Sequence, residues 1–330
     1  MDFLALGYRT TIRPAHRKRS KALNFFSNNS TKSVTIETCE QVLLITFREW
    51  LFKEQVQLYP PFREGFTQMA DYDDIEVTRT GHVALIEIQR PPHNFFDIAL
   101  IRQLADACNV LDADNNCRSI VLAAQGKSFC AGANFGDGSG QKIITDAKPK
   151  KPEPHLYQEA VRLYSCKKPM VGAIQGAAIG GGLGLALVPD FRVTCPEGRF
   201  SANFTRLGFH PGFGLTHTLP ALVGQQNAAL MMYTGRRVKG QEAFEMGLAD
   251  KIVPLEKIRD AAMELAEEIA ISSPLGVLET RATLRSGLAE RVRVATDHEL
   301  KIQNELRQTE DFKEGVAATA ERRTPNFQGR

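Results

Sequence analysis

The chain has 330 residues, 43% of them hydrophobic and 24% charged, and its formal net charge is +3 at pH 7. These values are typical of a globular protein with a sizeable core, in one large domain or two smaller ones, and give no reason to expect a nucleic-acid partner. No apolar run is long enough for a membrane-spanning helix. The six cysteines contain no Cys-x-x-Cys pair, which argues against a metal site and for a reducing compartment.

The first 68 residues are basic. They hold ten Lys and Arg against six Asp and Glu, with no acidic residue between Asp2 and Glu37. An Arg-rich, acid-poor start is typical of a mitochondrial transit peptide, but a disordered extension or a start codon placed too early would look the same. Met69 would be a natural beginning for the ordered domain. We therefore expect a cytoplasmic protein, or a mitochondrial matrix protein if residues 1–68 include a transit peptide.

The ordered part opens with a predicted hairpin. Residues 75–77 and 83–88 alternate partly between apolar and polar side chains, and Thr80-Gly81 lies between them. Asp97 is a predicted N-cap for a helix with one apolar face, and residues 120–124 form an apolar run typical of a buried strand. Strand, helix and strand in this order predict parallel pairing and right-handed crossovers.

The rest of the chain continues as an α/β protein. Residues 136–154, rich in glycine and proline, predict a loop, and a helix is expected over 156–166. Short strands are expected over 171–174 and 191–194. After Pro211 the chain is mainly helical, and one amphipathic helix is marked by Ile258, Ala262, Leu265, Ala266 and Ile269.

Two glycine-rich stretches each follow a predicted strand. They are Phe129-Cys130-Ala131-Gly132-Ala133-Asn134-Phe135 and Ile179-Gly180-Gly181-Gly182-Leu183-Gly184. Small residues let backbone amides approach a ligand, and two converging amides would form an oxyanion hole for a carbonyl oxygen that gains negative charge. Taken alone, the second stretch could equally serve a tight turn with close helix packing. Its spacing does not fit the common phosphate-binding loops.

Several motifs, in order, resemble the crotonase superfamily, which is the enoyl-CoA hydratase and isomerase family. The resemblance runs from about Asp71 to Arg330. Besides the two glycine stretches, it rests on Arg90-Pro91 with Asn94, Leu207-Gly208-x-x-Pro211-Gly212-x-Gly214, Thr234-Gly235-Arg236-Arg237, Ala243-x-x-x-Gly247-Leu248-Ala249 and Glu310-Asp311-Phe312-x-Glu314-Gly315.

The resemblance implies a crotonase-like spiral of repeated strand-strand-helix units with a C-terminal helical region that supports trimer formation. We divide the chain into a basic extension (1–68), a spiral core (69–255) and a C-terminal helical region (256–330). The resemblance also implies an acyl-CoA substrate, no cofactor besides the coenzyme A of that substrate, and assembly into a homotrimer or a dimer of trimers.

By position, the resemblance places the oxyanion amides on Ala133 and Gly181. A thioester carbonyl that becomes an enolate needs donors placed in advance, and each is typically worth about a hundred- to thousand-fold in rate. The helix that opens after Gly181 would add its positive end. The other residues expected to bind substrate flank these motifs: Asn94, Phe95, Ala131, Asn134, Phe135, Ile179, Gly180, Gly184, Asn203, Phe204, Pro211 and Gly212.

The chain departs from the family at the proton-transferring residues. Hydratases of the family use two glutamates, and the flanking motifs place these positions on Gly184 and Phe204, which cannot transfer a proton. His210 is a candidate acid-base because histidine titrates near neutral pH, although a histidine beside a proline is more often a loop residue packed for shape. Asp137 could swing in from its loop, or be an ordinary solvated acid.

Three functions stay open. The first is a crotonase-type lyase or isomerase, similar to enoyl-CoA hydratase, with a relocated or substrate-supplied base. The second is decarboxylation of a malonyl-type thioester, which generates the enolate without a protein base. The third is binding of acyl-CoA or of a protein partner without turnover. Gly184 and Phe204 further suggest room for an acyl group that is bulkier or more apolar than a short enoyl chain.

Overall fold

The computed structural model of the protein describes residues 67–134 and 155–330. Its larger sheet has the strand order β1-β2-β3-β4-β5-β7-β10. The pairs β1/β2 and β2/β3 are antiparallel, and every pair from β3 onward is parallel. The strands span Thr67–Ala70 (β1), Ile75–Thr80 (β2), Val83–Ile88 (β3), Ser119–Ala124 (β4), Met170–Ile174 (β5), Phe191–Thr194 (β7) and Lys251–Ile252 (β10).

A smaller sheet lies beside the second glycine stretch. Its strands are β6 (Ala177–Ile179), β8 (Arg199–Ser201) and β9 (Val238–Lys239), with β6 parallel and β9 antiparallel to β8. Because β6 ends at Ile179, the glycines begin where this small sheet stops and α5 (Gly181–Ala186) starts. The sheet edge therefore fixes the start of that helix.

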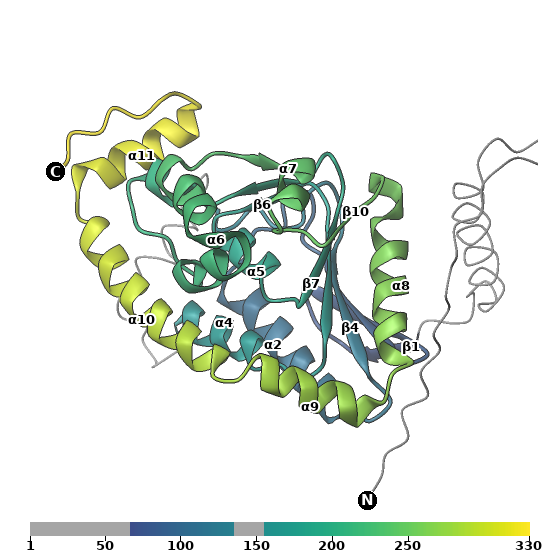
Figure 1. Ribbon diagram of the computed structural model, residues 1–330. Helices are drawn as coiled ribbons and strands as arrows, with labels where there is room; N and C mark the ends of the chain where they lie inside the picture. Colours follow the sequence, from purple (N-terminus) through teal and green to yellow (C-terminus); the bar gives the residue numbers. More distant parts are fainter. Residues whose placement is uncertain (1–66, 135–154) are drawn as a thin grey trace, which may run out of the picture. The chain divides into compact units, whose positions relative to one another are not determined.

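Helices cover both faces of the larger sheet. Figure 1 shows α8 (Ile258–Ala270) on one side of the strands, and α2 (Ile98–Ala113), α4 (Leu156–Tyr164), α5 and α6 (Leu215–Thr234) on the other. Strand β4 shows why both sides are needed: Ile120 and Leu122 belong to the core under α2, while Val121 and Ala123 belong to the core under α8. A strand buried on both faces reads as a continuous apolar run, as the sequence predicts.

The remaining helices close the C-terminal half of the fold. They are η1 (Asn203–Leu207), α7 (Gly240–Glu245), η2 (Leu255–Lys257), α9 (Pro274–Leu284), α10 (Leu288–Leu306) and α11 (Glu310–Glu321). Helix α10 packs against α4 and α6, and α11 packs against η1. Across the described ranges, no helix combines the length and apolar character needed to span a bilayer.

The predicted elements are largely confirmed. The hairpin, the strands at 120–124, 171–174 and 191–194, and the helix capped by Asp97 are all present, and the Asp97 carboxylate accepts a hydrogen bond of 2.9 Å from the amide of Leu100. Helix α4 ends at Tyr164, two residues earlier than predicted, because the next two amides bond carbonyls only three residues back. Strand β1 begins at Thr67, two residues before residue 69, where we placed the start of the spiral core. The expected loop over 136–154 and nearly all of the basic extension lie outside the described residues.

Candidate active site

A cavity of about 440 Å³ lies where the two glycine stretches meet α4, η1, α10 and α11. This volume is in the range of small-molecule sites. The first stretch contributes residues 131–134 to its wall and the second contributes residues 179–181. The cavity thus brings together Phe95, Ala131, Ala133, Asn134, Ile179, Gly180, Gly181, Asn203 and Phe204 of the predicted site.

The two glycine stretches lie directly against each other. The amide of Cys130 donates to the carbonyl of Ala177 (2.9 Å), and the amide of Ile179 donates to the carbonyl of Cys130 (3.0 Å). A Cβ atom at Gly132 would lie 2.6 Å from the Ile179 oxygen, and one at Gly182 would lie 2.1 Å from the Cys130 oxygen. Only glycine permits this approach, so the sequence pattern reflects packing as well as access to a ligand.

The orientation of the two candidate amides follows from the carbonyls that precede them. The Gly132 carbonyl accepts a hydrogen bond of 3.0 Å from the amide of Phe96, and the Gly180 carbonyl accepts one of 3.0 Å from the amide of Leu183. In a trans peptide the C=O and N–H groups point in opposite directions. The amides of Ala133 and Gly181 therefore point away from these bonds, and within the described residues neither donates to a protein acceptor.

The space beside Gly184, where the resemblance led us to expect a glutamate in a hydratase, is filled by an aromatic ring. A Cβ atom at Gly184 would lie 2.7 Å from the Cβ of Phe213, a buried residue whose φ is +64°. The Phe213 ring lines the cavity and packs at 5.8 Å from the ring of Phe96. Gly184 itself does not reach the cavity wall. The expected room for an acyl group beside Gly184 is therefore wrong, because Phe213 occupies that space.

Phe204, the second position where the resemblance led us to expect a glutamate, belongs to a row of aromatic rings. Phe204 lines the cavity, and its ring packs edge-on at 5.4 Å from Phe209, which packs in the same way on Phe312 of α11. Beside it, the Asn203 side-chain oxygen lies 3.3 Å from where a Cβ of Gly180 would be. This wall is apolar apart from Asn203, and edge-to-face rings stabilise it.

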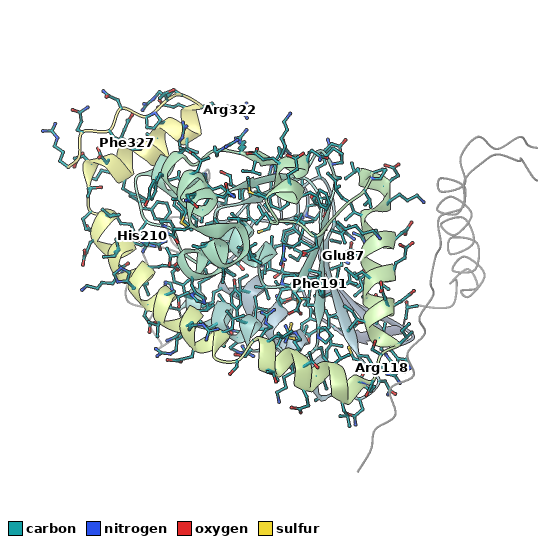
Figure 2. All side chains as sticks on the ribbon, viewed as in Figure 1. Glu87, Arg118, Phe191, His210, Arg322 and Phe327 are labelled. Carbon is teal, nitrogen blue, oxygen red and sulfur yellow. The ribbon has the colours of Figure 1, made fainter. Side chains whose placement is uncertain are left out.

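Several predicted site residues lie away from the cavity. Asn94 is fully buried, and its amide group donates to the carbonyls of Gln125 and Ser128, each at 2.7 Å, so its side chain holds the segment that leads into the first glycine stretch. The His210 ring lies near α10 (Figure 2), with Nδ1 2.8 Å from the Pro211 oxygen, and does not line the cavity.

Pro211 and Gly212 also lie outside the cavity wall. Gly212 lies behind Tyr157, since a Cβ there would come within 1.8 Å of the tyrosine oxygen. Phe135 and Asp137 fall outside the described residues. Of the two acid-base candidates predicted from the sequence, His210 therefore lies off the cavity wall, and Asp137 is not among the described residues.

The sequence reasoning missed four polar side chains that α4 and α10, with their capping residues, bring to the cavity wall: His155, Tyr157, Gln303 and Arg307. Burial, followed by the charge of Arg307, lowers the pKa of His155 to about 4. Burial also raises the pKa of Tyr157 and lowers the pKa of Arg307 to about 10. The only local signal was the four-residue spacing of Gln303 and Arg307, which puts both on one helix face.

The described wall of the cavity contains no Asp or Glu. The described residues likewise contain no group of three or more His, Cys, Asp or Glu side chains that could hold a metal ion. Among the described lining residues, His155 and Tyr157 are the side chains able to exchange a proton without being permanently charged.

Comparison with known proteins gives consistent results. The family model described as enoyl-CoA hydratase/isomerase matches residues 78–330. A probable enoyl-CoA hydratase from Rhodobacter capsulatus is 31% identical over 260 residues, covering 78% of this chain and 99% of that protein. A probable enoyl-CoA hydratase from Mycobacterium tuberculosis is 34% identical over 239 residues, covering 72% and 91%. The crystal structure of an enoyl-CoA hydratase/isomerase from Pseudoalteromonas atlantica superposes with a TM-score of 0.70 at 28% identity, over 78% of this chain and all of that one.

Proposed function

The chain belongs to the enoyl-CoA hydratase/isomerase family, and we propose that it is an enzyme acting on an acyl-CoA thioester through an enolate held by the amides of Ala133 and Gly181. One observation carries the proposal: Ala133 and Gly181 line the same cavity, and the amides of both point away from the carbonyls that anchor their peptide groups. Such amides are fixed before charge develops on a thioester oxygen, so they stabilise it with little reorganisation.

The first candidate reaction is a crotonase-type hydration or isomerisation. Its support is the family itself and the names of the related proteins, which are probable enoyl-CoA hydratases. Such a reaction needs a group that moves a proton. With Gly184 and Phe204 at the usual positions, that group is either relocated in this chain or supplied by the substrate.

The second candidate is decarboxylation of a malonyl-type thioester. It is favoured by the absence of Asp and Glu from the described cavity wall and by the packing of Phe213 over Gly184. The bond between Cα and the carboxylate carbon breaks, its electron pair forms the enolate, and carbon dioxide leaves. The enolate oxygen then accepts hydrogen bonds from the two amides until solvent protonates Cα. No protein base takes part.

A panel of acyl-CoA thioesters with products read by mass spectrometry separates these reactions. A gain in mass equal to one water identifies hydration, and a loss equal to carbon dioxide identifies decarboxylation. An unchanged mass with a shifted double bond identifies isomerisation. If the purified chain binds thioesters but turns over none of the panel, the enzyme proposal fails in favour of a binding role.

We also propose that the chain assembles into a homotrimer. Helix α9 supports this, because it contains no buried residue and its Leu275 and Leu284 side chains are 74% and 81% exposed. Arg281 on the same helix is tied to Asp190 by a hydrogen bond of 2.8 Å, so the helix is held in place with these two leucines outward. An exposed apolar surface of this kind is typical of an interface.

A further inference from the structure

The wall of the cavity formed by α4 and α10 carries a hydrogen-bonded group that the oxyanion hole does not use. We name it the α4–α10 cluster: His155, Tyr157, Gln303 and Arg307. The Tyr157 hydroxyl and the Arg307 Nη2 both donate to the Gln303 side-chain oxygen at 2.9 Å, and the Gln303 amide nitrogen donates to the His210 carbonyl at 2.8 Å. The cluster is therefore a built arrangement rather than a chance meeting of surface side chains.

The Gln303 oxygen and the His155 Nδ1, which are acceptors of the cluster, are engaged within the protein. The Gln303 oxygen already accepts two hydrogen bonds. The Nδ1 of His155 accepts the amide of Tyr157 at 3.1 Å as the N-cap of α4, so a neutral ring carries its proton on Nε2. Because the pKa of His155 is lowered to about 4, the ring is neutral at pH 7 and presents this N–H.

The cluster is also positively charged. Although burial lowers the pKa of Arg307 to about 10, its guanidinium remains protonated at pH 7. Arg322, at the end of α11 (Figure 2), is the other charged side chain on the described wall, and no described lining residue is acidic. Glu299, one turn before Gln303 on α10, accepts bonds from the amides of Gly214 (2.8 Å) and Thr216 (3.0 Å) at the start of α6, so it is engaged there.

A wall that carries a protonated guanidinium and no described acidic side chain is complementary to an anionic oxygen group. Resting on the proposed function, we propose that the α4–α10 cluster binds a carboxylate carried by the acyl group, so that the substrates are coenzyme A thioesters of dicarboxylic acids. A guanidinium matches a carboxylate in charge and in planar geometry.

The place of the cluster favours an acyl carboxylate over a phosphate of coenzyme A. Tyr157 touches Gly212, whose neighbour Phe213 packs on Gly184 within α5, one turn from the Gly181 amide. The cluster thus adjoins the part of the cavity where the thioester carbonyl would sit. The phosphates of coenzyme A are separated from that carbonyl by the long pantetheine arm and would have to fold back to reach Arg307.

Binding of saturated thioesters to the full-length chain tests the proposal without turnover. Calorimetry would compare succinyl-, glutaryl- and adipoyl-CoA with butanoyl-, pentanoyl- and hexanoyl-CoA. At the best chain length we expect the dicarboxylic member to bind at least about tenfold more tightly. Arg307→Met should remove this preference, because it should weaken the binding of the dicarboxylic member more than that of its monocarboxylic partner. Arg293→Met, at an exposed position of the same helix, should change neither.

Arg307→Lys is the control for misfolding. It keeps the positive charge, so it should retain part of the preference for the dicarboxylic thioester. Equal affinities of the paired thioesters for the wild-type chain would overturn the inference and leave the proposed function standing. Arg307→Met could also weaken the binding of both members of a pair equally, and have no such effect on acyl-pantetheine thioesters, which lack the nucleotide. That result would overturn the inference and assign Arg307 to a coenzyme A phosphate. If no thioester binds at all, the proposed function fails and the inference with it.

Discussion

Phe213 occupies the space that a side chain at Gly184 would need. A Cβ atom at Gly184 would lie 2.7 Å from both Cβ and a ring carbon of Phe213, and Phe213 is 1% exposed. The space beside Gly184 is therefore packed with an aromatic ring, not left open. An acidic side chain cannot be introduced there without moving Phe213.

Gly184→Glu should destabilise the fold without creating hydratase activity. The new side chain overpacks against Phe213 and buries a charge, so we expect a loss of about 3 kcal/mol or more in the free energy of unfolding, measured by urea denaturation. Adding Phe213→Ala should recover part of that loss. Gly276→Ala is the control, because its Cβ would lie 3.5 Å from the nearest atoms and should be tolerated. A stable Gly184→Glu single variant would contradict this packing.

His155 should make the fold less stable in acid. Its pKa is about 4 in the folded chain, below the ordinary value, so the unfolded chain binds the proton first as the pH falls. The contribution of the neutral ring is complete above about pH 6.5 and is lost as the pH falls to about 4, by up to about 3 kcal/mol. His155→Asn keeps a residue able to cap α4 but does not titrate. Urea denaturation at pH 7 and pH 4.5 should show a smaller pH effect in this variant; an equal effect would count against burial of the ring.

Asn94→Ala should weaken both the fold and catalysis. It removes the donors to the Gln125 and Ser128 carbonyls and puts alanine at a φ of +49°. We expect a loss of about 2–3 kcal/mol in unfolding free energy and a lower kcat, because the first glycine stretch begins directly after Ser128. Asn116→Ala, on the exposed surface, should leave both unchanged. An Asn94→Ala variant with wild-type stability and a raised KM alone would instead indicate a substrate contact.

Charged substitutions on α9 should dissociate the proposed trimer. Leu275→Glu with Leu284→Glu places charges on the exposed apolar surface of the helix. Light scattering should report a trimer for the wild-type chain and a monomer for this variant. Val110→Glu, at an exposed position on α2, should remain trimeric. A monomeric wild-type chain would rule out the assembly.

The sequence predicts those parts of the site whose cause is local. The apolar run of β4 and the two glycine stretches are visible because each reflects burial or close approach within a few residues. The packing of Phe213 beside Gly184 cannot be predicted, because a glycine in the sequence does not indicate which distant side chain occupies the space next to it. The α4–α10 cluster is hidden for the same reason: Tyr157 and Gln303 are 146 positions apart and meet only after α10 packs on α4.

The most direct test of the oxyanion hole compares Gly181→Pro with Gly181→Ala. Both add a Cβ atom that would come within 2.3 Å of the Phe96 ring, but only proline removes the amide hydrogen. On whichever thioester the chain turns over, we expect kcat for Gly181→Pro to fall about a hundred- to thousand-fold below that of Gly181→Ala. Equal kcat values for the two folded variants would contradict a role for the Gly181 amide in stabilising the enolate.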